Sequence, residues 1–248
     1  MGANATSTQS NPGNLEHALM AGRARALMST RAEELESLIK AYENLPSLDA
    51  PKSRKAGLMY AAAMAYTQQK QDVKAREAVR RLLEVSAADA AGLRAVRWLA
   101  ADTELKLGNP QACLNYLKEE SVERPAMLLQ MQCKLAIKDK MLTQQVIEKM
   151  QLWLAQFPRD PLAWDTAAQA YLQNGMTLQA IRADAESRAV RWDEIAAIDR
   201  LRAGQELARK LNQQGKLDLA GQQEASIIDT RLRALERIRI ELLRPQNN

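Results

Sequence analysis

The side chains that most often carry chemistry in proteins are scarce in this sequence. His17 is the single histidine, and Cys113 and Cys133 are the two cysteines. A zinc site needs three or four such ligands, so neither a HExxH helix nor a four-cysteine site can be built from this chain. A hydrolase with a nucleophile and a histidine base is not expected either, because one histidine near the N-terminus supplies no such arrangement.

Paired carboxylates are the remaining candidates for acid–base chemistry. Glu33 and Glu34 are adjacent, as are Glu119 and Glu120. Neighbouring residues of a helix point about 100° apart, so each pair faces two sides of a helix and is interpreted as solvated charge. The sequence also lacks a glycine-rich loop of the kind that holds phosphates. We therefore expect no catalytic residue, no metal ligand and no cofactor in this chain.

The two cysteines are spaced so that they could bond to each other. Cys113 lies ten residues before Glu123 and Cys133 lies ten residues after it, and a turn is expected near 122–124. In an antiparallel helix pair, residues equidistant from the turn lie at the same height. A disulfide is compatible with this spacing if both side chains face the seam between the helices. Two buried free thiols is the alternative.

The elements that would position these residues are predicted to be helices. Of 248 residues only 4% are aromatic, there are 10 Gly and 8 Pro, and Ala, Leu, Gln, Arg, Glu and Lys fill most of the chain. These side chains lose little freedom in a helix, and a β-sandwich or barrel would need more Val, Thr and aromatic residues. Apolar periodicity predicts helices over 14–29, 31–45, 52–69, 72–86, 90–107, 110–121, 125–138, 142–156, 160–174, 177–191, 193–213 and 217–243.

Alternation of helices and short turns is typical of repeat proteins. Trp164, Ala168, Tyr171, Gly175 and Ala180 follow the spacing of the tetratricopeptide (TPR) pattern. The small Ala168 and Ala180 would let two helices approach closely, while Trp164 and Tyr171 would fill the space beside that contact. Gly175 would lie in the turn between the helices.

Two weaker copies of the pattern lie upstream, over 59–79 and 96–116. An unrelated helical bundle that uses alanine at its contacts is the alternative. The repeat hypothesis predicts an all-α, TPR-like helical-repeat solenoid of about 12 antiparallel helices with capping helices that lack the TPR pattern. Its parts would be a flexible lead (1–13), N-terminal capping helices (14–51), the repeats (52–191) and C-terminal capping helices (192–248).

A TPR array is expected to bind protein along its concave face. On the repeat offsets, the side chains of that face that are not used for packing are Tyr60, Met64, Arg97, Ala101, Asp165 and Gln169. Because the set mixes an aromatic ring, a methionine and charges of both signs, we expect it to bind an extended peptide or a partner helix. A wetted face without a ligand is the alternative.

Charge and hydropathy argue against other classes of partner. The formal net charge is +5 and the pI is about 9.2, but the basic residues are spread along the chain among acidic ones, so we expect no nucleic-acid partner. No apolar run reaches the ~18 residues that a membrane span needs. The N-terminal residues also lack the charged and apolar regions of a signal peptide.

Four stretches, taken in order, resemble a known family. They are 17–28 (HALMAGRARALM), 57–61 (GLMYA), the repeats, and 224–233 (EASIIDTRLR). Over roughly residues 15–243 the chain is similar to the C-terminal TPR half of bacterial periplasmic zinc metallopeptidases of the β-barrel assembly-enhancing protease type. In that family an N-terminal HExxH domain hydrolyses peptides. The TPR half packs against this domain and engages substrates and the outer-membrane assembly machinery.

The resemblance implies a periplasmic protein-binding scaffold, with a metallopeptidase domain and the outer-membrane assembly machinery as partners. The HExxH motif itself does not occur in this chain. Only the scaffold and its binding role are therefore expected here. A free-standing TPR adaptor that assembles a complex without a protease is the alternative, with a cytoplasmic location as the alternative to the periplasm.

Overall fold

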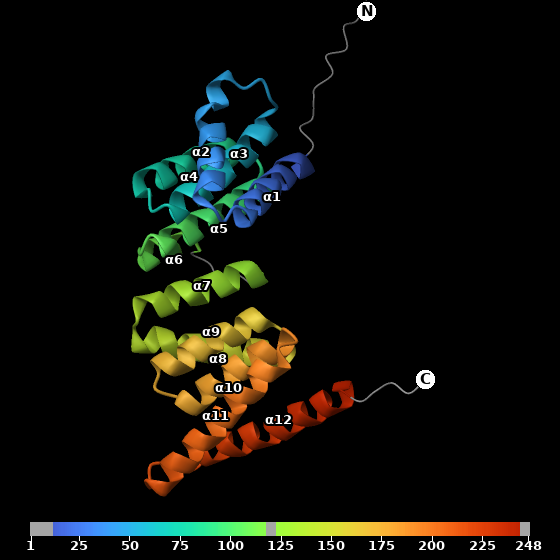
Figure 1. Cartoon of the computed structure of the whole chain (residues 1–248). Coiled ribbons are helices and arrows are strands. Elements are labelled where there is room, and N and C mark those ends of the chain that lie inside the picture. Colours follow the sequence, from blue (N-terminus) through green and yellow to red (C-terminus); the bar gives the residue numbers. More distant parts are fainter. Residues whose placement is uncertain (1–11, 118–122, 244–248) are drawn as a thin grey trace, which may run out of the picture. The chain divides into compact units, whose positions relative to one another are not determined.

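The computed structural model describes residues 12–117 and 123–243, and every element in those ranges is helical (Figure 1). The predicted all-α class is therefore confirmed for the described residues. The helices are α1 (Pro12–Met28), α2 (Ala32–Glu43), α3 (Lys52–Gln68), α4 (Asp72–Ser86), α5 (Ala90–Lys106), α6 (Pro110–Tyr116), α7 (Arg124–Ile137), α8 (Lys140–Gln156), α9 (Pro161–Gln173), α10 (Thr177–Val190), α11 (Glu194–Gln213) and α12 (Leu219–Leu243). A short 3-10 helix, η1 (Leu45–Ser47), follows α2 and has no counterpart among the predicted helices.

The predicted boundaries agree with the structure to within a few residues except at one helix. The sequence predicts a helix over 110–121, whereas α6 ends at Tyr116. Leu117 already has φ −112° and ψ 40°, which lies outside the helical region. The rest of the predicted helix, 118–121, lies outside the described residues.

Local side-chain chemistry explains where several helices begin and end. Asp89, Asp139, Asp160 and Asp193 each accept a hydrogen bond from the backbone N–H three residues further on, at 2.7–3.2 Å. Such N-caps satisfy a backbone donor that the first turn of a helix leaves free. The described residues that close helices with a positive φ are Gly108, Gly175, Gly215, Lys70, Lys138 and Trp192. Many of these helix-capping and helix-ending residues can be recognised in the sequence, which is why the boundaries could be predicted.

The chain forms two compact units, Met1–Cys133 and Lys134–Asn248, and each is described by itself. The predicted division into capping helices and repeats, at 51/52 and 191/192, stays a prediction. Among the described residues no helix is long and apolar enough to cross a membrane.

Helix α3 is the centre of the first unit. Helices α1, α2 and α4 all pack against it, and ten of its 17 residues are buried. Residues 60–67 are buried without interruption, because a helix that is covered on several sides has no solvent face.

Helix α1 packs against α3 and α5, whereas α2 packs against α3. The backbones of α1 and α3 come closest at two glycines. A Cβ on Gly22 would lie 2.1 Å from the carbonyl oxygen of Gly57, and a Cβ on Gly57 would lie 2.4 Å from that of Ala18. On α5, a Cβ on Gly92 would lie 2.7 Å from the side chain of Leu15. Glycine is required at Gly22 and Gly57 because the space between the two helices holds no side chain.

A disulfide joins α6 to α7. Cys113 and Cys133 have Cα atoms 6.2 Å apart and are both fully buried, which confirms the disulfide over the free-thiol alternative. Cys113 is the only buried residue within α6, and Ala101, Leu117 and Ala126 complete a small cluster around the bond. The disulfide therefore adds a covalent link to the packing of the short α6 against α5.

The second unit combines an apolar core with ion pairs between its helices. Its core is formed by α10, α11 and α12, through Leu178, Ala185, Ile198, Leu201, Ile228, Leu232 and Leu235. Arg231 of α12 donates two hydrogen bonds, of 2.8 and 2.9 Å, to Glu186 of α10, and Arg182 of α10 pairs with Glu224 of α12. Both carboxylates are largely shielded from solvent, so these charge-assisted contacts fix how α12 lies on α10.

Replacing Gly22 by alanine should destabilise the first unit. Alanine normally favours a helix over glycine by up to about 1 kcal/mol, but here the added methyl would meet the backbone of Gly57. Overpacking of this kind typically costs about 1–3 kcal/mol. We expect a lower melting temperature for Gly22→Ala and almost no change for Ala24→Ser, an exposed substitution on the same helix. An unchanged melting temperature in Gly22→Ala would show that α1 does not approach α3 this closely.

Removing the disulfide should loosen the end of the first unit. The bond links residues 20 positions apart, and a loop of this length corresponds to about 3 kcal/mol of chain entropy. We expect the double variant Cys113→Ser/Cys133→Ser to lose about that much free energy of unfolding. Dithiothreitol should destabilise the wild type and leave the double variant unaffected. Identical denaturation curves of the wild type with and without dithiothreitol would contradict the bond.

Candidate binding site

Three of the six residues that the repeat pattern assigns to a binding face are buried. Tyr60, Met64 and Ala101 are 3%, 6% and 0% exposed. Tyr60 and Met64 lie on α3, against which α1 packs, whereas Ala101 lies in the apolar cluster around the disulfide. Burial raises the pKa of Tyr60 to about 12, and the charges of Arg23 on α1 and Asp102 on α5 act on the same hydroxyl. The expectation that these three residues are open to a partner is corrected, because other helices of the chain cover them.

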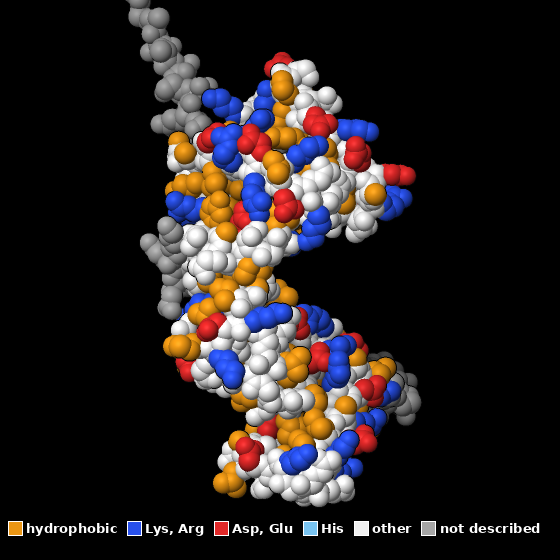
Figure 2. Space-filling model, turned by 90° about the vertical axis from the view of Figure 1, so that its left-hand side faces the viewer, with side chains coloured by type: hydrophobic (Ala, Val, Ile, Leu, Met, Phe, Trp, Pro, Cys, Tyr) orange, Lys and Arg blue, Asp and Glu red, His pale blue; other side chains and the backbone are white. Residues whose placement is uncertain are grey.

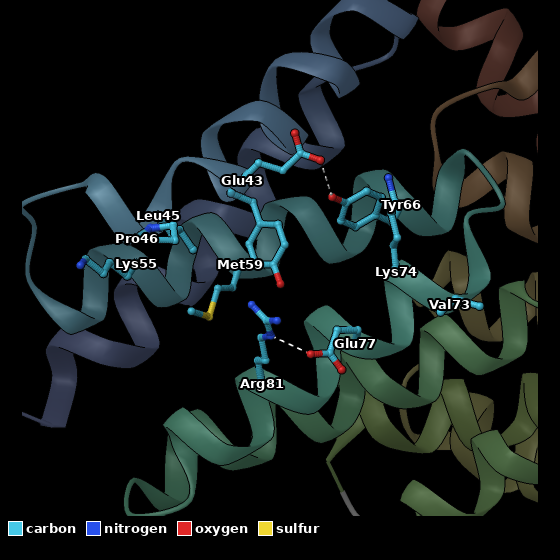
Figure 3. Close-up of a pocket in the computed structure, with 11 residues that line it drawn as sticks. Glu43, Leu45, Pro46, Lys55, Met59, Tyr66, Val73, Lys74, Glu77 and Arg81 are labelled. Carbon is cyan, nitrogen blue, oxygen red and sulfur yellow. Dashed lines mark hydrogen bonds and ion pairs between the residues drawn. The ribbon is translucent and has the colours of Figure 1, made fainter.

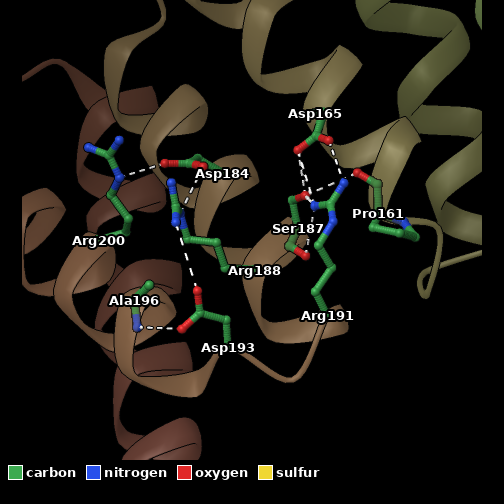
Figure 4. A network of polar contacts seen from close by, with 9 residues as sticks. All are labelled: Pro161, Asp165, Asp184, Ser187, Arg188, Arg191, Asp193, Ala196 and Arg200. Atoms are coloured by element: carbon green, nitrogen blue, oxygen red, sulfur yellow. Dashed lines mark hydrogen bonds and ion pairs between the residues drawn. The ribbon is translucent and has the colours of Figure 1, made fainter. Parts of the chain in front are cut away.

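The other three predicted residues differ in environment. Arg97 is exposed on α5 of the first unit, and Gln169 is exposed on α9 of the second. The carboxylate of Asp165 accepts hydrogen bonds from Arg191 at 2.6 Å and from Ser187 at 2.5 Å, so it ties α9 to α10 (Figure 4). A role of Arg97 and Gln169 in binding stays a prediction.

A cavity of about 600 Å³ opens in the first unit between α2, η1, α3 and α4 (Figure 3). Its size falls within the range of about 300–1,000 Å³ that is usual for ligand pockets. No residue of α1 lines it. The lining residues are Tyr42, Glu43, Leu45, Pro46, Lys55, Met59, Tyr66, Val73, Lys74, Glu77 and Arg81.

The inner wall of this cavity is aromatic. The buried ring of Tyr66 packs edge to face against Tyr42, with centroids 6.1 Å apart and ring planes at 86°. The Tyr66 hydroxyl donates a long hydrogen bond of 3.5 Å to Glu43, and the ammonium of Lys74 lies 5.5 Å from the ring centroid. Edge-to-face and cation–π contacts both fix the orientation of a ring. Met59 also lines the cavity (Figure 3), and together with these rings it gives the cavity a preformed apolar surface.

Basic side chains outnumber acidic ones around the cavity. Glu77 accepts hydrogen bonds from Arg80 at 2.8 Å and from Arg81 at 2.7 Å, and these bonds lower its pKa to about 2. Lys55 and Lys74 have no acidic partner within ion-pair distance among the described residues. The cavity therefore combines apolar walls with two unpaired ammonium groups. A ligand that carries an apolar side chain next to a carboxylate would be complementary to it.

The ionisable groups of the lining are two tyrosines, two glutamates, two lysines and one arginine. The lining contains no histidine and no cysteine. Burial, with the nearby Glu43, raises the pKa of Tyr66 to about 12, so its phenol is neutral at physiological pH, and Glu77 is ionised. An efficient general acid or base titrates close to the working pH. Among the described residues, no three potential ligands lie close enough together to hold a metal ion.

The cavity could not be predicted from the sequence, because the helices that form its walls were expected to have different roles. The sequence assigns α2 to a cap and α3 and α4 to a repeat, and η1 carries no periodic signal. A usable signal is the spacing of Lys74, Glu77 and Arg81, which places three charges on one face of a helix. Tyr42 and Tyr66 are two of only five tyrosines, but their contact depends on the packing of α2 against α3.

Charge elsewhere on the surface is mixed. On the face shown in Figure 2, Lys and Arg side chains are interspersed with Asp and Glu side chains in each unit. A nucleic-acid surface would gather its basic residues into one patch or stripe. This face therefore offers no support for a nucleic-acid partner.

No protein-family model and no curated protein sequence matches this chain. The candidate site is therefore assigned from its own geometry.

Alkaline pH should weaken the packing around Tyr66. Its pKa of about 12 in the folded protein exceeds the ordinary value of 10.0. The buried neutral phenol therefore makes its full contribution to the free energy of unfolding below pH 10. This contribution is lost as the pH rises through 12. Between these values the free energy of unfolding should fall less steeply in Tyr66→Phe than in the wild type. The two proteins should change in parallel between pH 7 and 9. Parallel curves up to pH 12 would show that Tyr66 is not shielded.

Proposed function

We propose that this chain is a TPR-like helical-repeat scaffold that binds protein and has no catalytic activity of its own. The observation that carries the proposal is the preformed cavity between α2, α3 and α4, with its aromatic wall and unpaired lysines. Protein interfaces are commonly anchored by a few apolar or aromatic side chains that enter pockets of this kind. The arrangement of helices in an extended solenoid belongs to the same proposal.

The chemistry of the cavity favours an extended partner segment in which an apolar side chain stands next to an acidic one. Tyr42 and Met59 would contact the apolar side chain, and methionine adapts its shape to different partners. Lys74 lies next to Tyr66 at the inner wall (Figure 3), where its ammonium would pair with the carboxylate. The cavity would therefore select partner segments by the types of their side chains, and it would not require one exact sequence.

The disulfide supports a periplasmic location, because disulfides persist in oxidising compartments and are rare in the cytosol. There the chain would recognise substrates or partners for a zinc metallopeptidase in outer-membrane protein quality control, as its resemblance to that family implies. A free-standing adaptor that assembles a complex without a protease is the alternative.

The cavity should be required for partner capture. Met59→Arg would place a long charged side chain in it, and Lys74→Glu would reverse the charge at its wall. The immobilised chain is incubated with a cell-envelope extract, the captured proteins are identified, and a purified partner is titrated by calorimetry. We expect each variant to raise the dissociation constant about tenfold or more, as the loss of an interface anchor does.

Lys140→Glu is the matched control for charge reversal, because Lys140 is exposed on α8 of the second unit. All variants should keep the helical content of the wild type. Equal dissociation constants for the wild type, Met59→Arg and Lys74→Glu would contradict the proposed site. A zinc peptidase among the captured proteins would favour the metallopeptidase role over the adaptor.

A further inference from the structure

The C-terminal half of α1 carries apolar residues on both of its faces. Toward α3 and α5 it buries Leu19, Gly22 and Ala26. On the opposite face Leu27 is 58% exposed and Met28 is 80% exposed. Surface helices ordinarily place charged and polar residues on the side away from the core, and a helix that is apolar all round is normally covered all round.

The exposed apolar residues form one stripe. At 100° per residue, Met20, Ala24 and Leu27 fall within about 60° of one another around the helix axis, and Met28 lies next to them. All four are exposed. The stripe runs along the C-terminal half of α1, away from the glycine contact that fixes its other face.

Two unpaired arginines border this stripe. Around the helix axis Arg23 lies at one edge of the stripe and Arg25 lies at the other. Both are exposed, and neither has an ion pair with another described residue. Glu16 is the one acidic residue of α1, and it lies about two turns before Arg23. Over residues 20–28 the exposed face of α1 is therefore apolar along its middle and positively charged at both edges.

We infer that the outer face of α1 docks an amphipathic helix of a partner protein, whose apolar stripe is bordered by acidic residues. The charge pattern specifies the acidic borders, since Arg23 and Arg25 would each pair with a carboxylate across the interface. Exposed Ala24 leaves room for a second helix to approach α1 closely, in the way that ridges of one helix enter grooves of another. Met20 and Met28 can adjust to the partner's side chains.

A helical protein partner fits this face better than a membrane does. Lipid-binding segments usually gather about four to eight basic residues, and the outer face of α1 offers two. Two arginines on opposite edges of an apolar stripe instead match the flanking charges that set pairing between helices. This docking surface is independent of the cavity in the proposed function, because no α1 residue lines that cavity.

The test uses the full chain and three synthetic helical peptides with the same leucine stripe. Their flanking positions are all Glu, all Gln or all Lys, and binding is measured by fluorescence anisotropy at fixed salt. The Glu peptide should bind about tenfold or more tightly than the Gln peptide, and the Lys peptide should bind most weakly. Arg23→Glu/Arg25→Glu should reverse this order, and Leu27→Glu should weaken binding of all three.

Leu152→Glu is the matched control, because Leu152 is an exposed leucine of the second unit. It should leave peptide binding unchanged, as should Met59→Arg, which distinguishes this surface from the cavity. Absence of binding by all three peptides, or binding that ignores their charge, would overturn the inference. Vesicles of phosphatidylcholine and phosphatidylglycerol serve as the membrane probe. Vesicle binding that is lost in Leu27→Glu, without charge-selective peptide binding, would assign the face to a membrane and overturn the inference as well.

Discussion

The close approach of α1 to α3 is the constraint on which the arrangement of the first unit depends. Gly22 and Gly57 bring the two backbones together, and a Cβ on either residue would collide with a carbonyl oxygen. Close-packed interiors do not absorb such a clash without displacement. The contact therefore holds α1 over α3 and α5, and it closes the face on which Tyr60 and Met64 would otherwise meet a partner.

With that face closed, apolar side chains of the first unit remain accessible at two other sites discussed above, among the described residues. One is the cavity that Tyr42 and Tyr66 line, and the other is the outer face of α1 around Leu27. Both combine apolar area with basic groups that have no acidic partner in the part of the chain that the structure describes. A partner with acidic residues beside apolar ones would be complementary to either surface, in keeping with the net positive charge of the chain.

Elsewhere, covalent and ionic contacts supplement a limited apolar core. Cys113 is the one buried residue of α6, and its disulfide links this short helix covalently to α7. In the second unit, Asp165 and Glu186 accept from arginines of neighbouring helices (Figure 4 shows the contacts of Asp165). Arginine suits this role because its long side chain reaches across a helix interface and donates two parallel hydrogen bonds.

The sequence by itself determined the all-helical class and most helix boundaries. These follow from local chemistry, since Pro110 and Pro161 begin helices. The spacing of the cysteines was compatible with a disulfide and with two free thiols, and the structure decided for the bond. Only the tertiary structure decided which helix faces are covered. Periodicity identifies the apolar residues of α1 but not the helix that they contact, and Gly22 and Gly57 are far apart in the chain. The cavity depends on packing between helices for the same reason, because a contact between distant segments leaves no mark on the local pattern of either.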